Sequence, residues 1–122
     1  MADASFILLY VDDVAVSEAF YVAILGRPTI DSAPTFAMLP AGPGVRLGLW
    51  RRDGVEPPAN AAGGGEIGFP VEADAMVDAL CAEWWAKGAR LAQEPTRMDF
   101  GYTFVALDPD GHRLRVFAPT PR

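Results

Sequence analysis

The sequence is poor in the residues that disulfide-rich, iron-dependent and nucleic-acid-binding proteins need. It has one cysteine, Cys81, so no internal disulfide can form and a reducing cytoplasm is the expected compartment. Its single histidine, His112, cannot supply the two-histidine, one-carboxylate triad of non-haem iron enzymes. Ten basic residues stand against 16 acidic ones, and the resulting net charge of −6 argues against nucleic acid as a partner.

Long apolar runs are absent as well. No stretch approaches the roughly 20 consecutive apolar residues of a membrane-spanning helix, so we expect no membrane partner. The first residues carry no basic segment ahead of an apolar stretch, and no secretory signal is expected. The chain is nevertheless rich enough for a packed core, since 51% of its 122 residues are hydrophobic and 11% are aromatic. This composition and length predict a single domain over residues 1–122.

An internal repeat divides the chain into two similar halves. The segment TFAML at residues 35–39 returns as TFVAL at 103–107, and GVRLGLW at 44–50 returns as GHRLRVF at 111–117. The two matches occur in the same order, which makes chance a poor explanation for both. We expect a first module over residues 5–50 and a second over residues 65–118. The Pro- and Gly-rich stretch 51–64 is the expected linker.

Each half has the pattern of one strand, one helix and three further strands. In the first helix the apolar residues at helical spacing are Val16, Phe20, Tyr21 and Ile24, and Gly26 is placed to end it. The elements expected in the first half are a strand at 6–11, a helix at 14–25 and strands near 28–31, 35–40 and 45–50. Those expected in the second half are a strand at 66–71, a helix at 74–87 and strands near 90–93, 102–107 and 113–118.

Several short motifs accompany this β-α-β-β-β order. They are YVDD at 10–13, FY at 20–21, LG at 25–26 and the turn DPDGH at 108–112. With these motifs nearly the whole chain resembles the vicinal-oxygen-chelate superfamily, which includes glyoxalase I, extradiol dioxygenases and bleomycin-resistance proteins. The resemblance implies an α+β fold in which two β-α-β-β-β modules form a curved mixed-sheet cup, the glyoxalase/bleomycin-resistance fold. It also implies a homodimer.

Within that superfamily the chain is most similar to small antibiotic-binding resistance proteins, phenazine-resistance proteins among them. The likeness is carried by LW at 49–50, FGYTF at 100–104 and RV at 115–116. The function it implies is non-catalytic binding and sequestration of a planar aromatic small molecule in a metal-free cup. One alternative is a lyase, isomerase or dioxygenase of the same superfamily with an unusual or absent metal site, in which Glu66 could act as a base. Another is a structural or interaction module.

The same resemblance places the superfamily's four metal-ligand positions at Phe6, Gly48, Glu66 and Arg115. Only Glu66 has a metal-binding side chain, whereas Zn, Fe or Mn sites need three or four donors. We therefore expect no metal, no other cofactor and no catalytic residue. His112 follows a tight turn and is expected to brace it by hydrogen bonds. Cys81 is expected to be a buried residue on the apolar stripe of the second helix.

Side chains alternate between the two faces of a strand, so the metal-equivalent positions identify the neighbours that share the cup. A glycine inside a strand often marks close approach of a ligand, and Gly48 and Gly68 are expected to leave room for a flat molecule. Trp50 is expected to stack on that molecule, and Gly101 to let the loop 98–102 close over it. The predicted ligand-binding residues are Phe6, Leu8, Tyr10, Phe36, Arg46, Gly48, Trp50, Glu66, Gly68, Phe100, Tyr102 and Arg115.

The charged residues of the cup leave two interpretations open. Glu66 and Arg115 either pair with each other or anchor a charged group of the ligand, with Arg115 or Arg46 binding a carboxylate through two parallel hydrogen bonds. The sequence also leaves open whether the modules pair within one chain or across a dimer. Of the adjacent tryptophans, Trp84 is expected in the core of the second module and Trp85 at an interface.

Overall fold

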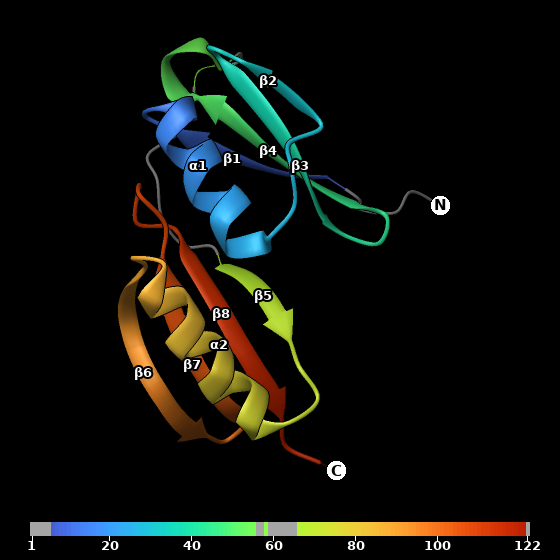
Figure 1. Ribbon diagram of the computed structural model, residues 1–122, viewed down its shortest axis with the longest axis vertical. Coiled ribbons are helices and arrows are strands. Elements are labelled where there is room, and N and C mark those ends of the chain that lie inside the picture. Colours follow the sequence, from blue (N-terminus) through green and yellow to red (C-terminus); the bar gives the residue numbers. More distant parts are fainter. Residues whose placement is uncertain (1–5, 56–57, 59–65, 122) are drawn as a thin grey trace. The chain divides into compact units, whose positions relative to one another are not determined.

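The chain folds into two units of the same construction. The computed structural model describes residues 6–55, 58 and 66–121. The compact units are Met1–Ala62 and Gly63–Arg122, and each holds one helix and a four-stranded mixed sheet (Figure 1). The α+β class and the two β-α-β-β-β modules are confirmed. Most of the expected linker 51–64 lies outside the described residues, although a short 3-10 turn, η1 (Arg52–Gly54), falls within it.

In unit 1 the strand order is β1-β4-β3-β2, with β1 and β4 parallel and the other pairs antiparallel. Its elements are β1 (Phe6–Val11), α1 (Val14–Leu25), β2 (Asp31–Ala33), β3 (Phe36–Gly42) and β4 (Val45–Arg51). Helix α1 packs against β3 and β4, and the side chains of Leu39, Leu47 and Leu49 are buried. Helix α1, the one α-helix among the described residues of unit 1, thus covers one side of this sheet.

Local sequence sets both ends of α1. The Asp13 carboxylate accepts a hydrogen bond from the Val16 backbone N–H at 3.1 Å, which satisfies one of the amides that a helix start leaves free. Gly26 adopts φ 66°, the left-handed conformation that ends many helices. The expected apolar stripe is partly wrong, because Val16 is 51% exposed and Ser17 is buried in its place.

Unit 2 repeats the arrangement with the order β5-β8-β7-β6, in which β5 and β8 are parallel. Its elements are β5 (Glu66–Pro70), α2 (Asp74–Ala86), β6 (Arg90–Met98), β7 (Gly101–Leu107) and β8 (Arg113–Pro119). Helix α2 covers β6, β7 and β8. Trp84 packs edge to face against Phe69 and Phe104, with ring centroids 5.5 and 5.4 Å apart, which confirms its place in the core. Trp85 is exposed, and its role at an interface stays a prediction.

Most strands end within two residues of the expected ranges, and two differ by more. The strand expected near 28–31 is β2 at Asp31–Ala33, because its residues pair with the first residues of β3. The strand expected near 90–93 extends to Met98, with register shifts between Leu91 and Thr96. Pro95 is tolerated because β6 is an edge strand. In the part of the chain that the structure describes, no helix combines the length and apolarity needed to cross a membrane.

Candidate functional site

The side of the unit 1 sheet opposite α1 carries the predicted ligand-binding residues of the first module. Alternation along β1, β3 and β4 places these side chains together, and strand pairing arranges them in three rows. The rows are Phe6, Arg46 and Pro40; Leu8, Gly48 and Met38; and Tyr10, Trp50 and Phe36. We call these nine residues the free face of unit 1.

The free face is apolar and open. Phe6 is 45% exposed, Leu8 46% and Tyr10 37%, which are high values for large apolar side chains on a sheet that also has a buried side. Tyr10 and Trp50 meet edge to face, with ring centroids 6.5 Å apart and an interplanar angle of 76°. Two rings at this angle offer a flat aromatic molecule both a face and an edge to contact.

Gly48 lies in the middle row and its surroundings are filled. A Cβ at this position would be 2.6 Å from Phe6 Cε1, 2.7 Å from Leu8 Cδ2 and 3.1 Å from Phe36 Cζ. The expectation that Gly48 leaves space for a ligand is therefore wrong. Because Gly48 has no side chain, the side chains of Phe6, Leu8 and Phe36 pack directly over its backbone and form a continuous apolar surface there.

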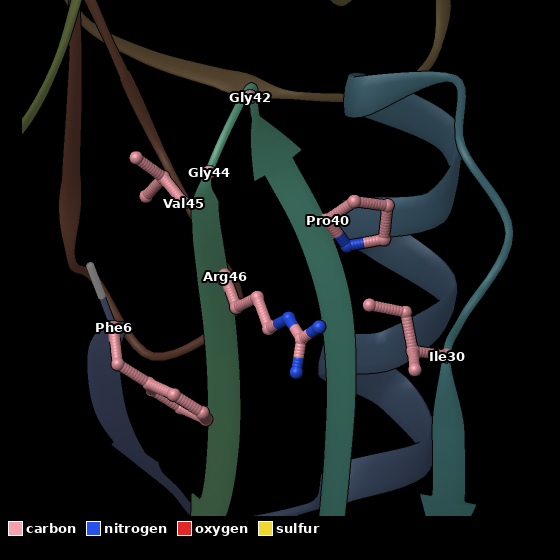
Figure 2. A pocket seen from close by; sticks show the side chains of 7 residues that line it. All are labelled: Phe6, Ile30, Pro40, Gly42, Gly44, Val45 and Arg46. Carbon is pink, nitrogen blue, oxygen red and sulfur yellow. The ribbon is translucent and has the colours of Figure 1, made fainter.

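A hollow of about 470 Å³ lies at the Phe6 end of the free face, beside the turn between β3 and β4 (Figure 2). This volume falls within the range of roughly 300–1,000 Å³ that is usual for small-molecule sites. Among the described residues that line it, Arg46 is the charged one, and its side chain extends from β4 toward β3 (Figure 2). The lining residues are Phe6, Ile30, Pro40, Gly42, Gly44, Val45 and Arg46.

The corresponding face of unit 2, opposite α2, is organised around an ion pair. Arg115 Nε donates to Glu66 Oε2 at 2.7 Å and Arg115 Nη2 donates to Glu66 Oε1 at 3.3 Å. Arg115 Nη1 also donates to Gln93 Oε1 and to Thr103 Oγ1, both at 3.3 Å. Of the two interpretations that the sequence left open, the structure contains the ion pair. Both charges are thereby neutralised within unit 2.

The ion pair also sets the charge state of Glu66. The hydrogen bond from Arg115 lowers the pKa of Glu66, partial burial acts in the opposite direction, and the charges of Arg115 and Arg113 add to the lowering. The carboxylate is ionised at neutral pH and accepts a proton weakly. This is the opposite of what a general base requires, since a useful base has a pKa near the working pH.

Phe100 and Phe117 lie beside the ion pair. Their ring centroids are 6.2 Å apart, and the Arg115 guanidinium carbon is 5.6 Å from the centroid of Phe100. Phe100 occupies a tight turn, because β6 ends at Met98, β7 begins at Gly101 and these two residues pair with each other. The closing loop expected at 98–102 is therefore wrong. A Cβ at Gly101 would collide with the Ala118 carbonyl oxygen, so this glycine serves close strand packing.

Tyr102 lies on the other side of the unit 2 sheet. Its hydroxyl donates to Asp78 Oδ1 of α2 at 2.7 Å, whereas its neighbour Thr103 contacts Arg115. The expected place of Tyr102 on the same face as the other predicted ligand-binding residues is wrong, because the register of β7 directs Thr103 to that side. Gly68 does lie in an open position, where an added Cβ would meet only Phe117 Cε1 at 3.5 Å.

The residues at the implied metal positions do not fit a metal ion. Phe6 and Gly48 have no donor atom in their side chains, and both carboxylate oxygens of Glu66 accept hydrogen bonds from Arg115. The guanidinium of Arg115 repels a cation at the place where the resemblance implies a ligand. A zinc or iron site needs three or four donors that converge on one point, and these four positions supply one.

A second grouping of potential ligand atoms belongs to the DPDGH turn. Side-chain atoms of Asp108, Asp110 and His112 lie within 4.8 Å of one another. Asp108 Oδ1 accepts the backbone N–H groups of Asp110 and His112 at 2.9 and 2.8 Å, and Asp108 Oδ2 lies 2.8 Å from His112 Nδ1. The buried carboxylate thus holds the turn together, and the bracing role expected of His112 is confirmed. Cys81 is buried, and desolvation raises the pKa of its thiol.

Sequence reasoning missed residues at both faces. Ile30 lines the hollow from the segment before β2, where no alternation pattern identifies it. Thr103 contacts Arg115, and the sequence repeat concealed it by matching Phe36 with Phe104. Strand pairing matches Phe36, opposite Trp50, with Thr103, opposite Phe117. The repeat is thus one residue out of structural register in this strand: the sequence match joins residues 68 apart, whereas strand pairing matches residues 67 apart, as in β4 and β8.

Comparison with known proteins gives one family. The chain matches the family model described as the Glyoxalase/Bleomycin resistance protein/Dioxygenase superfamily over residues 4–116. It is 32% identical over 112 residues to the phenazine antibiotic resistance protein EhpR of Enterobacter agglomerans, an alignment that covers 89% of this chain and 86% of that protein.

Solved structures agree with this match. Protein ATC0852 from Agrobacterium tumefaciens is 48% identical with a TM-score of 0.90, over 99% of this chain and 100% of that one. A glyoxalase-related enzyme from Fulvimarina pelagi has a TM-score of 0.84 at 21% identity, over 97% of this chain and 88% of that one. The second likeness, at low identity, shows a common fold alone.

Proposed function

The chain belongs to the Glyoxalase/Bleomycin resistance protein/Dioxygenase superfamily, and we propose that it binds and sequesters a planar aromatic small molecule without changing it chemically. The similarity to EhpR supports a binding role of the resistance type. Phenazines are flat, fused-ring heteroaromatic compounds, so a ligand of this class needs a broad apolar surface with aromatic side chains.

The observation that carries the proposal is the free face of unit 1. Phe6, Leu8 and Tyr10 expose large apolar area on one side of the sheet, and the Tyr10 and Trp50 rings are fixed edge to face. An apolar lining with few polar groups is typical of a ligand site. We further propose that the ligand site is metal-free and that Glu66, Gly68, Phe100 and Arg115 of unit 2 are also ligand-binding residues.

A lyase or isomerase role is disfavoured by the same geometry. Without metal donors at Phe6 and Gly48, the remaining candidate for proton abstraction is Glu66. Its hydrogen bonds from Arg115 lower its pKa and occupy both carboxylate oxygens. A base in this state has little capacity to take a proton from a substrate.

We also propose a homodimer in the cytoplasm. The exposed apolar residues of the free face are the kind of surface that a partner or ligand covers, and a free, buried Cys81 fits a reducing compartment. Sedimentation velocity at micromolar concentration tests the assembly, and a monomer there would contradict it.

The ligand test uses phenazine-1-carboxamide and isothermal titration calorimetry on the intact chain. We expect a Kd in the micromolar range or tighter, about −8 kcal/mol. Trp50→Ala should weaken binding by about tenfold to a hundredfold through lost stacking. The matched control is Trp85→Ala, which removes a tryptophan that is 64% exposed on α2. Equal losses in the two variants, or no binding by the wild type, would refute the proposal.

A further inference from the structure

Each unit has an arginine on the sheet face opposite its helix, Arg46 in unit 1 and Arg115 in unit 2, and the two differ in their contacts. Arg115 donates hydrogen bonds to Glu66, Gln93 and Thr103 and is neutralised by the first of these. Arg46, on the first module's strand β4, makes no ion pair or hydrogen bond with any residue in the described part of the chain. An arginine without a carboxylate partner keeps its full charge and all five of its donors for a ligand.

Arg46 is exposed, and the other described residues that line the hollow carry no charge. The Arg46 side chain lines the hollow of about 470 Å³ and extends from β4 toward β3, and the other described residues of the lining are apolar or glycine (Figure 2). Asp31, which pairs with Met38, is the carboxylate that the register of unit 1 places near this row, and no ion pair joins it to Arg46. In a protein of net charge −6, such a position is a local exception that favours an anion.

We propose that the hollow takes the carboxylate of the ligand, so that the compound bound on the free face is a planar aromatic carboxylate rather than a neutral aromatic. This inference rests on the proposed function and names the ligand class. The guanidinium pairs with the carboxylate through two parallel hydrogen bonds. Arg46 and Trp50 lie four residues apart on β4, about 13 Å in an extended strand, so the fused rings then lie over Phe6 and Leu8 and reach toward Trp50.

The test compares phenazine-1-carboxylate with phenazine-1-carboxamide, which have the same rings but differ in charge. Calorimetry should show that the wild type binds the carboxylate about tenfold more tightly than the carboxamide, and that Arg46→Gln lowers this ratio to about one with the carboxamide Kd unchanged. The matched control is Arg113→Gln. Arg113 occupies the equivalent place in the repeat and pairs in register with Glu66, as Arg46 does with Phe6. Arg113→Gln removes one positive charge, as Arg46→Gln does, and should leave the roughly tenfold preference for the carboxylate over the carboxamide unchanged.

Each outcome decides between the two proposals. A ratio that persists in Arg46→Gln, or that falls equally in Arg113→Gln, overturns the assignment of the hollow. If neither phenazine binds, the proposed function has failed, and the hollow is then judged with benzoate alone by two-dimensional amide NMR. Shifts confined to Gly42, Gly44 and Arg46 that vanish in Arg46→Gln support the anion site, and their absence overturns it. Equal melting temperatures of the variants show that folding is intact.

Discussion

The two units have the same order of elements, but the sheet faces opposite their helices differ in chemical character. In unit 1 the middle row holds Gly48 beneath Phe6 and Leu8, so the surface is apolar. In unit 2 the equivalent place in the repeat is Arg115, which is paired with Glu66. A duplicated module can thus keep its backbone while one copy presents aromatic area and the other a closed ionic network. The backbone pattern decides which residues share a face, and the residue types decide what that face binds.

Substitution of one tryptophan in each unit should give the largest difference in stability between the units. Trp84→Ala should destabilise the protein by about 3–5 kcal/mol, because Trp84 is 3% exposed and packs on Phe69 and Phe104. Trp50→Ala should cost about 1 kcal/mol, because Trp50 lies at the partly exposed end of the free face. Urea unfolding measures both. Equal costs would mean that Trp50 is a core residue.

Replacing Gly48 of unit 1 or Gly68 of unit 2 by alanine should give a smaller difference in stability. Gly48→Ala should cost about 0.5–1.5 kcal/mol, since its Cβ would displace the exposed ends of the Phe6 and Leu8 side chains, which lie at 2.6 and 2.7 Å. Gly68→Ala meets only Phe117 at 3.5 Å, and should be neutral or stabilise by up to about 1 kcal/mol. Thermal unfolding of the two variants gives the difference. A neutral Gly48→Ala would show that these side chains move aside freely.

The ionic network of unit 2 should contribute a modest, pH-dependent stability. The pKa of Glu66 is lowered in the folded protein by Arg115, so its contribution is complete at neutral pH and is lost as the pH falls from the ordinary glutamate pKa through the lower folded value. Because the Glu66 side chain is 33% exposed, the effect should stay within about 0.5–1 kcal/mol. Melting temperatures of wild type and Glu66→Gln between pH 7 and pH 3 measure it. The gap should close in acid, and a gap that widens there would contradict the assignment.

A chelator should leave the melting temperature of the protein unchanged. A structural metal stabilises the folded state by mass action, so EDTA would lower the melting temperature of a metal-binding protein. The donor count at Phe6, Gly48, Glu66 and Arg115 predicts an unchanged melting temperature. Elemental analysis of the purified protein complements the scan, and one metal ion per chain would overturn the count.

Much of the fold could be predicted because its signals are local. Asp13 and Gly26 fix the ends of α1 at the residues expected from sequence, and alternation along β1 identifies the free face. The errors arise where tertiary contacts decide. Alternation places Gly48 on the right face but says nothing of how far the side chains of Phe6 and Leu8 reach. Likewise, the pairing of Met98 with Gly101 makes a tight turn of a segment whose composition suggested a loop.

The parallel pairing of the first and last strand in each unit also constrains folding during synthesis. β1 pairs with β4 and β5 pairs with β8, so each sheet is closed by a contact between strands roughly 40–50 residues apart within its own unit. The hydrogen bonds of one sheet do not require any strand of the other. Unit 1 can therefore complete its sheet once β4 has left the ribosome, before β8 has been translated. The strand pairs of each sheet therefore have the sequence separations of a chain of half the length, and short separations favour fast folding.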